Sequence, residues 1–189
     1  HASEGYGKHY QQTYSSGYYA LLWENIEKPI TRSILEELNA EGKRSCLDFA
    51  CGTGRITEVA NQCFDSVTGV DISTDMLTVA RERLHDVTFI EQDVTSHILD
   101  KSFDVITSYR FFLNAEESLR KEVLLALKKM LDDSGILIIN VHINKTSILG
   151  FIYRARNFLF RRNLANTLGY QEFKELLDQT GFVICDSRW

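Results

Sequence analysis

Short apolar runs alternate with stretches of helical apolar spacing along most of the chain. The runs, each typical of a buried strand, lie at 46–49, 67–72, 87–90, 103–109, 136–141 and 182–185. Apolar residues recur at helical spacing at 30–38, 56–63, 118–131 and 168–181. The nearly continuous apolar run at 136–141 is typical of a parallel strand buried on both faces. The alternation predicts an α/β fold with a doubly wound, mainly parallel sheet.

Composition narrows the class of protein without naming a function. The 189 residues suit one domain, 1–189, and no apolar run is long enough to span a membrane. The net charge of −5 disfavours a nucleic-acid partner. The four cysteines are scattered without a Cys-x-x-Cys pair, so we predict reduced thiols, no metal site and a cytoplasmic location. We interpret His1-Ala2-Ser3 as the remnant of a purification tag.

The stretch from Cys46 to Arg55 predicts a ligand-binding loop between a strand and a helix. Ala50, Gly52 and Gly54 are small, so a ligand can lie against the backbone at the free N–H groups of the helix start. Open α/β sheets hold nucleotide-like molecules in this way. The dinucleotide fingerprint, however, requires a further glycine three residues after Gly54, where this chain has Thr57.

The segment Leu47-Asp48-Phe49-Ala50-Cys51-Gly52-Thr53-Gly54 resembles the first motif of the class I S-adenosylmethionine-dependent methyltransferases. Asp48 stands at that motif's acidic position, and Ala50 stands where many members have the first glycine. Val70-Asp71-Ile72-Ser73 resembles the second motif, and Asp93-Val94 matches the third position in register. The resemblance implies a Rossmann-like methyltransferase fold, in which a final antiparallel strand would be missing because the chain ends at Trp189.

The resemblance also implies how S-adenosyl-L-methionine would be held. Asp71 would accept hydrogen bonds from both ribose hydroxyls. The alternative for Asp71 is a helix N-cap, a role that Ser73 could take instead. Asp93 would bind the adenine amino group, although alone it is typical of a turn. Thr107, Ser108 and Tyr109 would lie beside the methionine half of the cofactor. The predicted cofactor residues are Asp48, Ala50, Cys51, Gly52, Gly54, Asp71, Ile72, Met76, Asp93, Val94 and Ser108.

The N-terminal segment 6–28 is rich in aromatic residues. Tyr6, Tyr10, Tyr14 and Tyr18 recur every four residues and would mark one side of a helix. Related methyltransferases often place such a segment over the active site, so we predict a lid in which Tyr14 and Tyr18 touch the substrate. The alternative is a stripe that simply packs on the domain.

Three further residues are candidates for the acceptor side of the site. Arg110 and Asn114 follow the fourth strand, and Arg110 can hold a carboxylate or phosphate. The alternative for Arg110 is an ion pair with Glu116 or Glu117. His142 follows the fifth strand and titrates near neutral pH, so it is a candidate general base. Methyl transfer depends mainly on alignment, so a base is not required.

The segment 145–166 lies where this family inserts a substrate-capping element. Five basic residues and no acidic one occur from Lys145 to Arg162. This segment fits three interpretations: a grip on an anionic substrate, contact of 147–162 with a membrane surface near a lipid-linked substrate, or a cap helix whose arginines face water.

The sequence therefore predicts a methyltransferase that acts on a small-molecule acceptor, possibly anionic, sugar- or lipid-linked, as a monomer or homodimer. Two alternatives remain: an NAD(P)-dependent oxidoreductase, and a non-catalytic S-adenosylmethionine-binding protein. The sequence identifies neither the acceptor nor the methylated atom.

Overall fold

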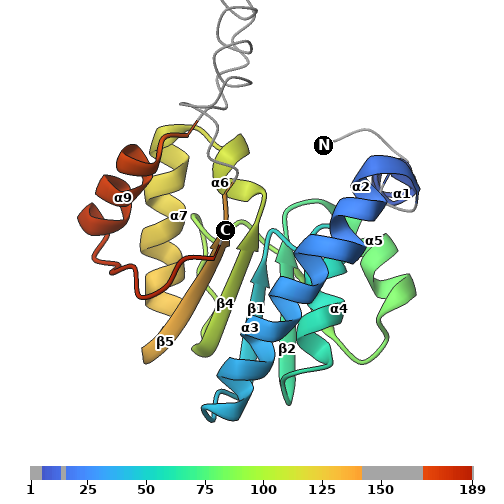
Figure 1. Ribbon diagram of the computed structural model, residues 1–189, viewed down its shortest axis with the longest axis horizontal. Helices are drawn as coiled ribbons and strands as arrows, with labels where there is room; N and C mark the ends of the chain where they lie inside the picture. The colour runs from blue at the N-terminus through green and yellow to red at the C-terminus, as the bar shows by residue number, and fades with distance from the viewer. Residues whose placement is uncertain (1–5, 14–15, 142–167, 189) are drawn as a thin grey trace, which may run out of the picture.

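The computed structural model describes residues 6–13, 16–141 and 168–188 (Figure 1). Its elements, in chain order, are α1 (Tyr6–Thr13), α2 (Gly17–Leu22), a π-helical turn η1 (Trp23–Glu27), α3 (Lys28–Ala40), β1 (Ser45–Phe49), α4 (Arg55–Asn61), β2 (Ser66–Asp71), α5 (Thr74–Arg83), β3 (Thr88–Glu91), β4 (Phe103–Tyr109), α6 (Phe111–Asn114), α7 (Glu117–Met130), β5 (Leu131–Asn140) and α9 (Tyr170–Gln179).

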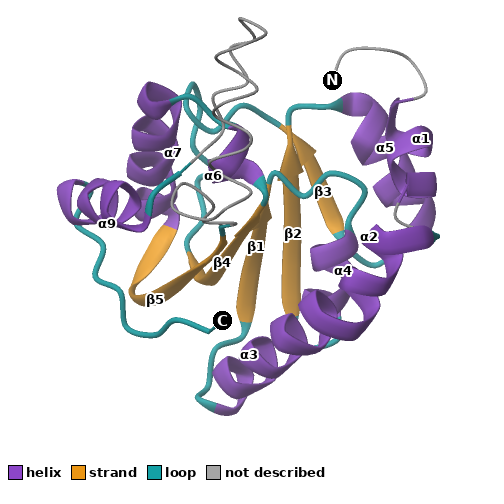
Figure 2. Cartoon of the chain, turned by 45° about the horizontal axis from the view of Figure 1, so that its top comes forward, coloured by secondary structure: helices purple, strands orange, loops and turns teal. Residues whose placement is uncertain are grey.

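The five described strands form one parallel sheet in the order β3-β2-β1-β4-β5. The order reverses between β1 and β4, which is the topological switch point where such sheets bind ligands. Helices α3 and α4 cover one face, and α7 and α9 cover the other (Figures 1 and 2). This arrangement confirms the predicted doubly wound α/β fold.

Two apolar layers sandwich the sheet because β1 and β4 carry buried side chains on both faces. One layer joins Leu47, Phe49 and Ile106 to the buried face of α7 and α9. The other joins Cys46 and Val105 to α3 and α4. Consecutive residues of these strands therefore belong to opposite layers, because the side chains of a strand point alternately to the two faces of the sheet.

The helix from Gly17 to Ala40 is continuous and contains one π turn. At this turn the N–H of Lys28 donates to the carbonyl of Trp23, five residues earlier. Pro29 follows directly and has no N–H of its own. The π turn buries Trp23 and Glu27 on the side that faces the domain. No described helix is both long enough and apolar enough to cross a membrane.

The helix predicted at 30–38 exists, but not all of its regularly spaced apolar residues are buried. Leu35 and Leu38 are buried as expected, whereas Ile30 is 38% exposed. Thr31 takes the buried position instead, because its hydroxyl is bonded on both sides. It donates to the carbonyl of Glu27 at 2.7 Å and shares a hydrogen bond of 2.8 Å with the hydroxyl of Tyr109.

Two other predicted elements differ from the structure. Residues 182–185 form no strand, and Val183 is 87% exposed. Arg188 in this tail binds Glu37 of α3 instead of the tail joining the sheet. The fifth strand also starts earlier than the predicted run at 136–141. Residues 132–135 lie within β5 as an irregularity, because Leu131 pairs with Phe103 and Ile136 with Val105.

A buried ion pair anchors the π turn to the sheet. The guanidinium of Arg110, just after β4, donates to both carboxylate oxygens of Glu27 at 2.9 and 2.8 Å. The Glu27 side chain is 7% exposed and the Arg110 side chain 19% exposed. Arg110 also adopts a left-handed backbone with φ 62°, which is unfavourable for a residue with a Cβ. The ion pair therefore stabilises the strained backbone at Arg110, next to the carboxyl ends of the strands.

We expect Glu27→Gln to lower the free energy of unfolding by about 2–4 kcal/mol, because it leaves a mostly buried guanidinium without its counter-charge. The matched control is Glu24→Gln, which breaks the exposed pair with Lys28 at 2.9 Å and should cost no more than about 0.5 kcal/mol. Urea denaturation measures both variants. Equal costs for the two would contradict an anchoring role for the buried pair.

Candidate functional site

The candidate site lies at the carboxyl ends of β1, β2 and β4, on both sides of the switch point (Figure 2). The loop after β1 has three residues in the left-handed region: Ala50 at φ 56°, Gly52 at φ 56° and Gly54 at φ 80°. This backbone lets the chain leave the strand, turn sharply and enter α4. Small residues are required here because left-handed backbone strains any residue with a Cβ, and Ala50 carries that strain.

Backbone hydrogen bonds fix the loop in place. The N–H of Cys51 donates to the carbonyl of Val70 at 3.1 Å, which ties the loop to the neighbouring strand β2. The N–H of Gly54 donates to the carbonyl of Cys51 at 3.0 Å, and that of Glu58 to the carbonyl of Gly54 at 2.9 Å. The first turn of α4 therefore starts directly from the loop.

Asp48 is buried beneath this loop and is only 1% exposed. Its two carboxylate oxygens accept hydrogen bonds from the hydroxyls of Thr57 in α4, at 2.5 Å, and of Thr107 in β4, at 2.8 Å. Burial raises the pKa of Asp48 to about 6, against the lowering effect of the two threonines. In this arrangement Asp48 fastens the elements that carry the loop, so we assign it a supporting role rather than direct cofactor contact.

Asp71, at the end of β2, is the polar centre of the site. Its carboxylate accepts hydrogen bonds from the N–H of Gly52 at 2.8 Å and from the N–H of Ser73 at 2.9 Å. Partial burial raises its pKa, although the hydrogen bonds from Ser73 and Gly52 oppose this effect. A carboxylate has about four acceptor positions, so these bonds leave acceptor capacity for a ligand.

The N-cap interpretation offered for Asp71 belongs to its neighbour. Ser73 is the N-cap of α5, and its hydroxyl accepts from the N–H of Met76 at 3.4 Å. Ile72 projects beside Asp71 with 69% of its surface exposed, whereas Met76 is 7% exposed. Among these predicted cofactor residues, Asp71 and Ile72 are accessible to a ligand.

Asp93 makes the local bonds expected of a turn residue. Its carboxylate accepts from the N–H and the hydroxyl of Thr95, at 2.9 and 2.7 Å. These bonds, with the hydroxyl of Thr95 contributing most, lower the pKa of Asp93. Val94 is buried, at 2% exposure. The proposed contact of Asp93 and Val94 with adenine stays a prediction.

The three residues expected beside the methionine half of the cofactor, Thr107, Ser108 and Tyr109, have different hydrogen-bonding roles in the structure. Thr107 binds Asp48 and Tyr109 binds Thr31, so both hydroxyls belong to the packing of the domain. Burial raises the pKa of Tyr109 to about 12. Ser108 is fully buried, and its hydroxyl finds no hydrogen-bond partner among the residues that the structure describes. Only Ser108 therefore keeps a polar group available at this strand end.

Arg110 and Asn114, the predicted substrate residues, form hydrogen bonds within the protein. Arg110 pairs with Glu27, not with Glu116 or Glu117 as its alternative interpretation proposed. That partner lies 83 residues away in the sequence, so local spacing did not reveal it. The side-chain amide of Asn114 donates to the carbonyl of Arg110 at 2.7 Å and lies at the surface. Neither contact supports a grip on an anion by Arg110.

Helix α1 lies across the loop and the start of α5 (Figure 1). The hydroxyl of Thr53 donates to the side-chain oxygen of Gln11 at 2.8 Å, and the N–H of Gly7 donates to the carboxylate of Asp75 at 2.5 Å. A Cβ at Gly7 would lie 2.7 Å from the carbonyl oxygen of Asp75, so the helix approaches closely. These contacts place α1 where a lid would lie, and lid motion stays a prediction.

Several predicted residues take no part in the described site. Tyr18 is 73% exposed. Tyr14, His142 and the segment 145–166, including 147–162, lie outside the described residues.

The sequence did not reveal the structural roles of three residues near the site. They are Glu27, Thr31 and Thr57, the last of which binds Asp48. Polar residues at core positions of helices were the signal for Thr31 and Thr57, because a buried hydroxyl needs a partner. Glu27 gave no comparable signal, since the π turn that buries it was not predicted.

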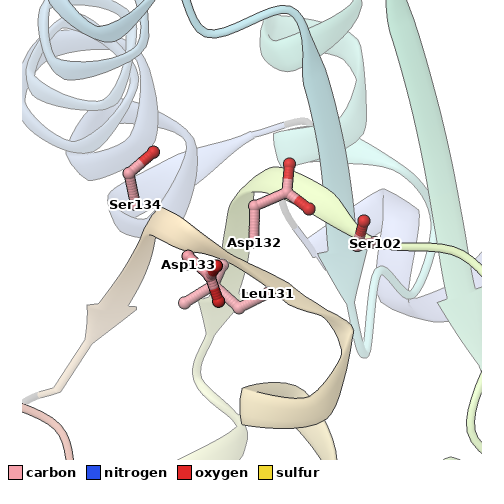
Figure 3. Close-up of a pocket in the computed structure, with 5 residues that line it drawn as sticks. All are labelled: Ser102, Leu131, Asp132, Asp133 and Ser134. Atoms are coloured by element: carbon pink, nitrogen blue, oxygen red, sulfur yellow. The ribbon is translucent and has the colours of Figure 1, made fainter.

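Other features of the described residues offer no competing site. A shallow hollow lies at the amino-terminal ends of β4 and β5, opposite the loop, and is lined by Ser102, Leu131, Asp132, Asp133 and Ser134 (Figure 3). No group of acidic, histidine or cysteine side chains within the described ranges is arranged to hold a metal ion. Burial raises the pKa of the thiols of Cys46 and Cys51, which keeps them unreactive.

Comparison with known proteins agrees with this geometry. The model of a family described as "Methyltransferase domain" matches residues 46–135, which run from the second residue of β1 into β5 and include the whole loop. The chain belongs to the class I S-adenosylmethionine-dependent methyltransferases. This confirms the family that the motifs of the sequence predicted.

Two curated relatives illustrate the range of this family. A malonyl-[acyl-carrier protein] O-methyltransferase of Bacillus cytotoxicus is 32% identical over 135 residues, which cover 66% of this chain and 46% of the relative. A dTDP-3-amino-3,4,6-trideoxy-alpha-D-glucopyranose N,N-dimethyltransferase of Streptomyces venezuelae is 41% identical over 64 residues, or 34% of this chain and 27% of the relative. The chain thus spans about half the length, or less, of these curated methyltransferases.

Solved structures show the same fold. Magnesium protoporphyrin IX methyltransferase from Synechocystis PCC 6803, with bound SAH, superposes with a TM-score of 0.73 at 20% identity, covering 95% of this chain and 84% of that one. DesVI of Streptomyces venezuelae superposes with a TM-score of 0.61 at 23% identity, covering 75% and 59%. At these identities the likeness concerns the fold alone.

We expect Ala50→Gly to raise the free energy of unfolding by up to about 1 kcal/mol, because glycine relieves the strain of left-handed backbone at some cost in chain entropy. Ala40→Gly in helix α3 is the control and should lower it by about 0.5–1 kcal/mol. Thermal and urea unfolding measure both. A loss of stability in Ala50→Gly equal to that of the control would contradict strain at this loop position.

The raised pKa of Asp48 predicts a pH dependence of stability. The native state binds this proton more tightly than the unfolded chain, whose pKa is near 3.9, so Asp48's contribution is complete below about pH 4 and is lost as pH rises through about 6. Relative to Asp48→Asn, the wild type should lose about 2 kcal/mol of unfolding free energy between about pH 4.5 and 7.5.

Urea denaturation at the two pH values tests this dependence. Asp104→Asn is the control, because hydrogen bonds from the N–H groups of Arg44 and Ser45 lower the pKa of Asp104. The wild type should show no such loss relative to Asp104→Asn. A difference between wild type and Asp48→Asn that stays constant with pH would overturn the assignment.

Proposed function

We propose that this chain catalyses S-adenosylmethionine-dependent methyl transfer to a small-molecule acceptor. The observation that carries the proposal is the Asp71 carboxylate at the switch point, fixed by the N–H groups of Gly52 and Ser73 with acceptor positions left for a ligand. Family membership adds the class of reaction. The curated relatives named above act on an acyl-carrier-linked malonyl group and on an amino sugar, by their names.

The residues of the site fit this cofactor. Asp71 would accept hydrogen bonds from the two ribose hydroxyls, and the exposed apolar side chain of Ile72 would cover a flat ring. The left-handed loop at 50–54 brings backbone, not side chains, to the ligand. The buried, unpartnered hydroxyl of Ser108 supplies a polar contact on the far side of the switch point, judged over the described residues.

When bound, S-adenosylmethionine supplies a methyl group on a sulfonium, which is electrophilic without further activation. The chain's own task is therefore alignment and exclusion of water. Asp71 and the loop would set the position of the cofactor, α1 would cover it through Gln11 and Gly7, and the ends of β4 and β5 would receive the acceptor. Well-oriented partners can gain effective molarities of about 10⁵ M or more.

The structure gives a physical reason to disfavour the oxidoreductase alternative. The third glycine of the dinucleotide fingerprint would stand at Thr57, and the hydroxyl of this residue is bonded to the buried Asp48. Removing this side chain would take away one of the hydrogen bonds that hold the buried Asp48. The other alternative, a non-catalytic protein that binds S-adenosylmethionine, differs from the proposed enzyme only in that it does not transfer the methyl group. Cytoplasmic location, a monomer or homodimer, and contact of 147–162 with a membrane surface stay predictions.

Binding of S-adenosylhomocysteine, S-adenosylmethionine and NADH, measured by calorimetry, tests the proposal. We expect the wild type to bind the first two at micromolar strength and NADH far more weakly. Asp71→Asn should weaken S-adenosylhomocysteine by about tenfold or more, because a hydrogen bond to a charged group is worth about 1.5–3 kcal/mol.

The matched control is Asp104→Asn at the opposite edge of the sheet. Asp104 also accepts two backbone N–H bonds, from Arg44 and Ser45, both at 2.9 Å. This variant should bind S-adenosylhomocysteine within about twofold of wild type, since it resembles Asp71→Asn only in its structural cost. Failure of folded wild type to bind either adenosyl ligand would refute the proposed function.

A further inference from the structure

Helix α2 is apolar, yet it has no buried face. Its six residues, Gly17–Leu22, carry no charge, and none of them is buried. Tyr18 is 73% exposed and Leu21 is 64% exposed. Helices without charged residues are normally covered in folded proteins, and contiguous exposed apolar surface is typical of an interaction site. Helix α2 therefore belongs to a surface that another molecule contacts.

The exposed apolar positions continue from α2 into α3 as a stripe along the helix 17–40. Four apolar residues recur here at a spacing of four, which places them on one side of the helix. These residues, which we call the helix stripe, are Tyr18, Leu22, Ile26 and Ile30. Ile26 is 52% exposed and Ile30 is 38% exposed, whereas Leu22 is partly covered. The side of the helix that faces the domain carries other residues, Trp23 and Thr31 among them.

The charged side chains beside the helix stripe are paired within the chain. Glu24 pairs with Lys28 at 2.9 Å, and the buried Glu27 pairs with Arg110 at 2.8 Å. Glu24 and Lys28 stand two positions from residues of the stripe, a rotation of about 200° that takes them to the opposite side of the helix. The stripe is therefore uncharged, so two copies can approach through it although each chain has a net charge of −5.

The helix stripe is complementary to a second copy of itself. In an antiparallel pair with a twofold axis at Ile26, the two copies of Ile26 would lie side by side. Leu22 of each copy would contact Ile30 of the other, so apolar side chains meet along the whole stripe. A lipid surface would instead favour several Lys or Arg residues beside the apolar ones, and Lys28 is the one basic residue between positions 18 and 30.

The exposed area is sufficient for a weak dimer. Tyr19 and Leu21 flank the helix stripe and are 47% and 64% exposed. If a large apolar side chain offers roughly 200 Å² when fully open, the stripe and these two residues expose roughly 500 Å² in each copy. Two copies would cover roughly 1,000 Å², which is near the lower limit for a specific protein interface.

We propose that the helix stripe is the interface of a homodimer in which the α2–α3 helices of two copies pack antiparallel. The proposal does not depend on the proposed function, because it rests on this surface alone. An interface of this size should form and dissociate with protein concentration, with a dissociation constant of about 10–100 µM.

Analytical ultracentrifugation over a range of protein concentrations tests the dimer. The wild type should shift from the monomer mass of 21.7 kDa to twice that mass as the concentration rises. Ile26→Glu brings two like charges together at the axis and should raise the dissociation constant by about a hundredfold or more. The matched control is Leu125→Glu in α7, because Leu125 is 43% exposed on the other face of the sheet. This control should associate as the wild type does.

A charge exchange at the same position gives a test that a merely destabilised variant cannot pass. Ile26→Lys and Ile26→Glu should each be monomeric alone and should associate when they are mixed, because opposite charges then meet at the axis. If the mixture stays monomeric, the antiparallel pairing at Ile26 is overturned. Circular dichroism melting confirms that each variant is folded.

Two further outcomes would overturn the dimer. One is a wild type that keeps the monomer mass at every concentration up to about 1 mM. The other is a loss of association in Leu125→Glu as large as that in Ile26→Glu. If the wild type is monomeric but sediments with vesicles of phosphatidylcholine and phosphatidylglycerol, and Ile26→Glu does not, the helix stripe faces a membrane surface and the homodimer is refuted.

Discussion

The buried carboxylate of Asp48 is the interaction on which the candidate site depends. Its oxygens hold the hydroxyls of Thr57 and Thr107, which joins the end of β1 to α4 and to β4 directly below the loop. A lone charged group would be costly at this depth, and two hydroxyl donors offset only part of that cost, as its raised pKa shows. The loop above can adopt strained left-handed backbone because the elements on both sides of it are fixed from beneath.

The second constraint is the way the N-terminal helix is attached. Trp23 lies against the guanidinium of Arg55 at 5.1 Å, at the start of α4, and Glu27 binds Arg110 at the end of β4. One helical segment therefore touches both sides of the switch point. Helix α1 adds contacts of its own, with Thr53 in the loop and with Asp75 in α5.

The sequence predicted those parts of the protein whose signal is local. The strand–loop–helix unit at 46–63, the position of Asp71 at a strand end and the alternation of strands with helices all follow from spacing within a few residues. Contacts between distant segments were not predictable in this way. Local spacing offers Arg110 only Glu116 and Glu117 as ion-pair partners, because Glu27 is far away in sequence. The apolar composition of 182–185 predicts a strand, but composition does not reveal whether a neighbouring strand edge accepts it. Asp93 shows a third case, in which a motif position also satisfies a local turn.

The π turn at Trp23–Glu27 adds one residue to a helix that otherwise repeats every 3.6 residues. One inserted residue rotates everything before it by about 100° relative to everything after it. The direction in which the residues before the π turn face therefore depends on the number of residues in this helix as well as on their identity. A single insertion or deletion between Gly17 and Ala40 would turn a different side of the residues before it toward the sheet. Length variation in this helix is thus a route by which one fold can change the surface beside its strand ends while the loop after β1 stays unchanged.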